Sequence, residues 1–106
     1  MADDVTWWAP QSTEARGLAR PVKGREQVIA LLMTRGLFKP DGRTWSIHHL
    51  VAEGDVVAAH ATMRAETVNG HPYENQYVFM FRIQQGRIAE VWEHLDTAHL
   101  YALLDS

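Results

Sequence analysis

The sequence predicts an α+β fold in which a curved antiparallel sheet, a cone-shaped or half-barrel meander, packs against two or three short helices. Three observations support this prediction. Four segments after Gly42 alternate apolar and polar residues with period two, brief glycine-containing turns separate them, and only two segments have helical spacing. Because the two middle strands are long, the sheet must twist and coil strongly to be covered in so small a domain.

The N-terminal segment predicts a short strand followed by a loop. Residues 4–9 combine β-branched and aromatic side chains and stop at Pro10, where a ladder donor is lost. Residues 11–23 mix small, charged and proline residues without a sustained period. We therefore expect a surface flap there.

Two segments have the spacing of an amphipathic helix. In residues 24–35 the side chains of Val28, Leu31 and Leu32 fall on one face, and glycine and proline follow as stop signals. A shorter helix is expected after Asp96, whose carboxylate suits the N-cap position.

The period-two segments predict consecutive antiparallel strands, because their connections are too short for a crossover and contain glycine, which adopts positive φ easily. In the middle strands the residues that point to either face of the sheet are apolar, so both faces are expected to be buried. Short helices cover only one face, and we expect a homodimer through the outer face. The expected strands are residues 44–52, 56–68, 73–84 and 87–95.

Composition narrows the class of protein. A chain of 106 residues suits one domain, residues 1–106, and 46% apolar and 22% charged residues are ordinary for a globular protein. A net charge of −3 without basic blocks argues against nucleic acid as a partner. The absence of cysteine excludes disulfides and thiolate chemistry. No spanning stretch or signal-peptide pattern is visible, so we expect no membrane association and a cytoplasmic location.

Two motifs resemble the nuclear-transport-factor-2-like superfamily and its SnoaL-like members. Residues 86–96, Gly-Arg-Ile-Ala-Glu-Val-Trp-Glu-His-Leu-Asp, are similar to the last strand of many SnoaL-like sequences, and residues 22–28, Val-Lys-Gly-Arg-Glu-Gln-Val, to the family's helix start. The resemblance implies a ketosteroid-isomerase-like cone fold around a pocket for a small apolar molecule. It implies no single reaction, because the superfold hosts isomerases, cyclases, hydrolases, dehydratases and non-catalytic binders.

The N-terminus of the chain differs from the pattern of the superfamily. Family members usually have an α-helix before the first strand, whereas Met1 stands directly before that strand here. The resemblance therefore implies either a pocket that is open on one side or a cover supplied by a partner subunit.

The limonene-epoxide-hydrolase members of the superfamily have a sharper residue pattern. Their Tyr-x-Asn pair falls on Thr6 and Trp8, their Arg-x-Asp pair on His60 and Thr62, and their last Asp on Glu93. Only the last carboxylate remains, so the resemblance does not extend to epoxide hydrolysis.

Glu93 and His60 are the candidate catalytic residues. Alternate residues of a strand share a face, so the two side chains meet if both faces point inward. A carboxylic acid in an apolar cavity has a raised pKa and an imidazole titrates near neutral pH, and such a pair suits isomerase, cyclase or dehydratase chemistry. The other expected pocket residues are Thr6, Trp8, Thr62, Arg64, Asn75, Tyr77, Phe79 and Trp92.

A second class of function stays open, namely a non-catalytic module for an apolar ligand or a dimeric scaffold. In that interpretation His60 is a packed residue and Glu93 forms a salt bridge with Arg64 or Arg82. The cavity is then filled by an aromatic side chain, for which the candidates are Trp8, Trp92 and Phe79.

Neither a metal nor another cofactor is expected. His48 and His49 are neighbours on one strand and should point to opposite faces, so they cannot chelate one ion together. His94, Asp96 and His99 match no metal-binding spacing. The glycines form no phosphate loop or nucleophile elbow.

Overall fold

The structure is a computed structural model that describes residues 1–17, 20–34 and 36–106. The chain begins with a short strand, a 3-10 helix, a two-residue strand and an α-helix, and continues with four long strands and a final helix. The elements are β1 (Thr6–Trp8), η1 (Gln11–Arg16), β2 (Val22–Lys23), α1 (Arg25–Thr34), β3 (Thr44–Glu53), β4 (Val56–Glu66), β5 (Pro72–Gln84), β6 (Arg87–Leu95) and α2 (Thr97–Leu104).

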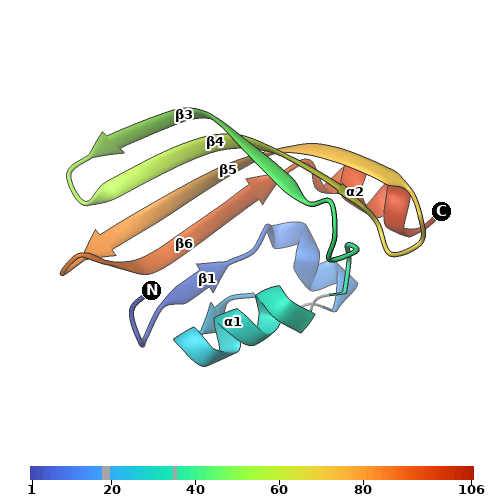
Figure 1. Cartoon of the computed structure of the whole chain (residues 1–106). Helices are drawn as coiled ribbons and strands as arrows, with labels where there is room; N and C mark the ends of the chain where they lie inside the picture. Colours follow the sequence, from blue (N-terminus) through green and yellow to red (C-terminus); the bar gives the residue numbers. More distant parts are fainter. Residues whose placement is uncertain (18–19, 35) are drawn as a thin grey trace.

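The six strands form one curved sheet in the order β2-β1-β6-β5-β4-β3. Strands β3 to β6 are the predicted antiparallel meander, which arches over α1 in Figure 1. Strand β1 adds to the free edge of β6 in parallel orientation, which the sequence did not predict. The α+β class with a curved sheet is therefore confirmed, and the sheet is mixed rather than wholly antiparallel.

Strand register divides the sheet into two faces. Cross-strand partners project to the same side, so Ala59, Phe79 and Glu93 form one row. The next row contains His60 and Val78 and projects to the opposite side. Phe79 packs against the buried core, so its side is called the inner face, and the side of His60 is called the outer face.

The core has two clusters on the inner face. One joins Val5, Trp7, Val28 and Val91 and fixes β1 and α1 to β6. The other joins Met63, Tyr73, Tyr77 and Leu100 and fixes α2 to the middle strands. The hydrophobic contacts thus attach the helices to the two ends of the meander.

Helix α1 begins where predicted and ends at Thr34. Val28 is fully buried, whereas Leu32 is exposed at the mouth of the cavity described below. Leu31, the remaining apolar position of the predicted stripe, lies outside the described side chains. In the predicted flap, residues 11–16 instead form η1, in which the buried hydroxyl of Thr13 donates a 2.6 Å hydrogen bond to the carbonyl of Pro10.

A bulge in β3 overturns the prediction for its two histidines. The register shifts between Ile47 and His49, so the strand gains one residue against β4. Nε2 of His48 then lies 2.7 Å from Oγ1 of Thr62, and Nδ1 of His49 lies 3.2 Å from Nδ1 of His60. Both imidazoles therefore lie on the outer face. Across the described ranges, no three His, Asp or Glu side chains are placed to hold a metal ion.

The outer face is only partly covered within one chain. Val51, Val78 and Met80 are exposed there, so the expectation that both faces are buried is not met by a single copy. None of the helices in the described residues is long and apolar enough to cross a membrane.

The first core cluster generates a stability prediction. We expect Val91→Ala to lower the free energy of unfolding by about 2 kcal/mol, because Val91 is only 1% exposed and the change leaves a cavity between β1, β6 and α1. The matched control Val68→Ala, at an exposed position in the turn between β4 and β5, should change it by less than about 0.5 kcal/mol. Urea unfolding measures both, and equal effects would contradict the assigned core.

Candidate functional site

A cavity of about 350 Å³ lies between the inner face of the sheet and the segments that cover it. The sheet supplies its floor, while η1, residues 36–43 and α2 supply its cover. A volume of this size is in the range of small-molecule sites. The floor residues are Trp7, Trp45, Met63, Tyr77, Phe79, Glu93 and Leu95.

The floor of the cavity is mainly aromatic, with Phe79 at its centre. The ring of Phe79 lies 5.7 Å from that of Tyr77 in a nearly parallel arrangement. Trp7 meets it edge-on at 6.2 Å, and Trp45 is tilted against it at 5.7 Å. These aromatic surfaces favour a flat apolar ligand.

Glu93 places a carboxyl group in this apolar lining. It projects from β6 on the inner face opposite Phe79 and is only 7% exposed. Among the described residues, the other charged side chain in the lining is that of Arg43, whose guanidinium carbon lies 5.6 Å from the ring of Phe38. Acidic groups are rarely buried so fully. Among the described lining residues, Glu93 is therefore the one that brings a carboxyl group to the cavity.

A hydrogen-bonded tyrosine pair lies beside Glu93 on the inner face. The hydroxyls of Tyr73 and Tyr77 are 2.8 Å apart, and the amide of Asn75 donates to Oη of Tyr73 at 2.8 Å and to the carbonyl of Asp96 at 2.9 Å. Burial raises the pKa of Tyr73, although its hydrogen bonds with Tyr77 and Asn75 act in the opposite direction. The Tyr73 phenol therefore stays protonated at neutral pH, and Asn75 joins β5 to the start of α2.

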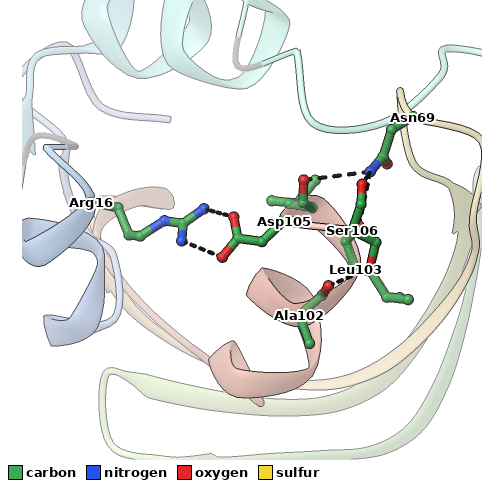
Figure 2. A network of polar contacts seen from close by, with 7 residues as sticks. Arg16, Asn69, Ala102, Leu103, Asp105 and Ser106 are labelled. Carbon is green, nitrogen blue, oxygen red and sulfur yellow. Dashed lines mark hydrogen bonds and ion pairs between the residues drawn. The ribbon is translucent and has the colours of Figure 1, made fainter.

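Two sets of polar contacts hold α2 in place over the cavity (Figure 2). The guanidinium of Arg16, at the end of η1, donates to both oxygens of Asp105 at 2.8 and 2.6 Å and lies 4.4 Å from the ring centre of Tyr101. The amide of Asn69, in the β4–β5 turn, donates to the carbonyl of Leu103 at 2.9 Å. We call the Arg16–Asp105 pair the clasp, because it ties the two covering helices together.

The structure separates the predicted catalytic pair. Glu93 is on the inner face, whereas His60 pairs in register with Val78 on the outer face. The prediction that the two side chains meet is therefore wrong. The error arose in β4, where alternate residues point to opposite faces. Both sets of residues are mostly apolar or small, so the sequence pattern does not show which set points inward.

Of the predicted ligand-binding residues, Tyr77 and Phe79 line the cavity. Asn75 is buried beside it and bonds to the protein. The remaining five project to the outer face by strand register, which corrects the prediction that they line the pocket. These five are Thr6, Trp8, Thr62, Arg64 and Trp92.

The outer-face residues have partners of their own. The indole of Trp8 donates to Glu90 at 3.3 Å, Arg64 pairs with Glu74 at 2.6 Å, and Nε2 of His60 lies 2.8 Å from Oε1 of Gln76. Arg82 likewise pairs with Asp55 and Glu90. The predicted salt bridge from Glu93 to Arg64 or Arg82 is therefore wrong, and Trp8 and Trp92 do not fill the cavity.

Sequence reasoning missed several lining residues, above all Trp7, Trp45, Met63 and Tyr101. Trp7 was missed because the Tyr-x-Asn pair of the hydrolase pattern aligns with Thr6 and Trp8, which flank it. The sequence offered no signal for this position, because it depends on the parallel register with β6, in which the inward Val91 is the partner of Trp7. Tyr101 lies on α2, which the sequence predicts as a helix. Its place in the cavity lining depends on where that helix packs, which the sequence does not show.

A family model for the SnoaL-like domain matches residues 1–91. The chain therefore belongs to the SnoaL-like family. A search of curated protein sequences gives no match.

Solved structures of the same fold cover the whole chain. An NTF2-like protein of unknown function from Burkholderia pseudomallei K96243 is 24% identical, with a TM-score of 0.87 over 100% of this chain and 80% of that chain. TerC, crystallised with polyporic acid, is 21% identical, with a TM-score of 0.84 over 100% and 81%. IdmH, a candidate polyketide cyclase from Streptomyces antibioticus, is 26% identical, with a TM-score of 0.72 over 100% and 82%. The chain thus shares its fold with these three proteins.

The clasp generates a prediction with a defined pH dependence. Hydrogen bonds from Arg16 lower the pKa of Asp105 below its ordinary value of 3.8. The stabilisation is therefore present above about pH 4 and is lost as the pH falls through the lowered pKa. We expect Asp105→Asn to lower the melting temperature slightly at pH 7, and the difference from the wild type to close as the pH falls through the lowered pKa of Asp105.

The control for this experiment is Asp4→Asn, which removes an exposed carboxylate away from the clasp. High salt should also reduce the effect of Asp105→Asn, because the pair is solvent-exposed. A difference that persists unchanged at low pH would show that Asp105 stabilises α2 by something other than its charge.

Proposed function

We propose that the chain binds a small, largely apolar molecule in the cavity and transfers a proton on it through Glu93, as an isomerase, cyclase or dehydratase does. The observation that carries the proposal is a carboxyl group only 7% exposed in a cavity with an aromatic floor. A general base or acid in such a site acts without competition from bulk water.

Glu93 is the single acid/base residue of this proposal, because His60 lies on the other face of the sheet. One carboxylate serves both directions of a proton transfer when it takes a proton from one atom of the ligand and returns it to another. The flat floor around Phe79 orients a ring compound beside it. The names of the similar structures, a candidate polyketide cyclase and a protein crystallised with polyporic acid, support cyclic ligands of this kind.

The alternative is a binding module that uses the same cavity without chemistry. It shares the floor and the cover with the enzymatic proposal, so the two differ only in what Glu93 does to a bound molecule. A reaction that needs a base and nothing else distinguishes them.

Hydrogen–deuterium exchange provides that reaction. The test compound is the ketone 1-tetralone in deuterated buffer, and the measurement is the rate of exchange at the carbon beside the carbonyl, followed by NMR. We expect saturable acceleration by the wild type and a loss of roughly 100-fold or more in Glu93→Gln, because the amide cannot accept the proton. Binding of the ketone, measured by thermal shift, should remain.

The matched control is His60→Gln, which changes a titratable side chain on the outer face. Its exchange rate should equal that of the wild type. If Glu93→Gln exchanges the ketone as fast as the wild type while both bind it, the acid/base role is excluded and the binding-only alternative holds.

We also propose that two copies of the chain associate through the outer face. Support comes from the exposed apolar side chains of Val51 on β3 and of Val78 and Met80 on β5, which share one sheet face with β4 between them. Closed twofold dimers are the commonest assembly of such faces.

The dimer is tested by placing a charge at its centre. Val78→Arg should convert the wild-type dimer to a monomer, because an unpaired guanidinium would be buried between the two sheets. Val68→Arg, at an exposed site in the β4–β5 turn, is the control and should leave the dimer intact. Sedimentation velocity measures both, and a wild-type monomer at every concentration would exclude the proposed interface.

A further inference from the structure

We infer that the molecule in the cavity carries a carboxylate, and that the guanidinium of Arg43 at the mouth of the cavity binds it. This inference rests on the proposed function, because it names the charge and the chemical class of the molecule that occupies the same cavity. It gives a role in specificity to a residue that the predicted site did not contain.

Arg43 brings the one positive charge among the described lining residues to the cavity. It stands directly before β3, two residues ahead of Trp45 on the cavity floor. Arg43 is exposed, whereas Glu93 is only 7% exposed. The positive charge therefore lies at the mouth of the cavity, and the carboxyl group of Glu93 lies inside.

The ring of Phe38, which also lines the cavity, fixes the place of the guanidinium. The guanidinium carbon of Arg43 lies 5.6 Å from the ring centre, within the usual range of a cation–π contact. Phe38 is itself held by the core, because its ring centre is 4.8 Å from that of Tyr73 and its backbone bridges to Thr67. A cation–π contact uses no hydrogen-bond donor, so the N–H groups of Arg43 remain free to donate.

No carboxylate in the described part of the chain lies within ion-pair distance of the Arg43 guanidinium, not even that of Asp41 two residues away. Lys39 on the same segment differs, since its ammonium pairs with Glu66. The arginines of the clasp and of the outer face likewise have carboxylate partners. Because Arg43 is exposed, water solvates its charge in the free protein and a ligand can reach it.

The charge of the lining sets the class of anion. A phosphate group is usually bound by several cationic or backbone N–H donors, whereas the described lining offers one guanidinium. The planar fork of a guanidinium matches the two oxygens of a carboxylate. Together with the aromatic floor and a volume of about 350 Å³, this favours a small planar ring compound with a single carboxylate.

The same charges set the orientation of such an acid. Its carboxylate is attracted to Arg43, and Glu93 offers it no positive charge. Its ring gains most by lying on the floor around Phe79, the residue opposite Glu93 on the inner face. The acid therefore enters ring first and presents the end remote from its carboxylate to Glu93.

The experiment compares two compounds of the same shape and different charge, 2-naphthoate and 2-naphthamide, on the full chain. Isothermal titration calorimetry gives their dissociation constants for the wild type, Arg43→Gln and Arg43→Lys. We expect Arg43→Gln to weaken the acid about five- to twentyfold, because a hydrogen bond to a charged group is strong but is reduced at an exposed site. The neutral amide should stay within about twofold, and Arg43→Lys should recover part of the loss for the acid.

The matched control is Arg87→Gln, which removes another exposed arginine outside the described cavity lining. It should leave both dissociation constants unchanged. Added salt should weaken the acid in the wild type and have little effect on the acid in Arg43→Gln, because the contact at the mouth is exposed to solvent.

A measurement on the wild type tests the orientation without any variant. Nuclear Overhauser contacts between 2-naphthoate and the protein report which ring of the acid lies deeper. We expect contacts from the unsubstituted ring to Phe79 and from the carboxylate-bearing ring to Phe38.

The outcomes separate the two proposals. If neither compound binds the wild type at any accessible concentration, the cavity is not a site for such molecules, and the proposed function fails together with this inference. If both compounds bind and the acid loses nothing in Arg43→Gln, or its carboxylate-bearing ring contacts Phe79 in place of Phe38, the role of Arg43 is overturned while the cavity remains a binding site.

Discussion

The pairing of β1 with β6 is the constraint on which the rest of the structure depends. By itself the meander of β3 to β6 is a curved sheet with no cover on its concave side. The register that sets Trp7 beside Val91 fixes β1 to the edge of that sheet and draws Val28 of α1 under it. Apolar burial of this cluster covers one end of the inner face, the second cluster holds α2 over the middle strands, and the cavity is the part of that face that these elements do not fill.

The two faces of the sheet use the same residue types for different purposes. On the outer face, polar side chains find partners on neighbouring strands, as Trp8 does with Glu90 and Arg64 with Glu74. The inner face instead has an aromatic surface with a few polar groups, of which Glu93 is the only carboxyl group among the described lining residues. Such a distribution is typical of sites in which apolar contact supplies affinity and a small number of polar atoms supplies orientation.

The architecture was predictable from the sequence, whereas the residues that line the cavity were only partly predictable. Period two, short glycine turns and the Asp96 cap are local signals, and they gave β3 to β6 and α2 nearly to the residue. Which face of a strand points inward is decided by tertiary contacts. In β4 the residues that point to either face are mostly small or apolar, so the sequence does not show which set is buried, and His60 was therefore placed on the same face as Glu93. The β3 bulge and the parallel pairing of β1 leave no short-range pattern, since both are settled by contacts between distant segments.

The distribution of the four indoles has an optical consequence. Trp7 and Trp45 line the cavity, whereas Trp8 and Trp92 project from the other side of the sheet. A molecule that stacks on the floor changes the surroundings of the first two and leaves those of the second two unaltered. Intrinsic emission from this chain thus contains an occupancy-sensitive part and a constant reference, so filling of the cavity can be followed without an attached dye.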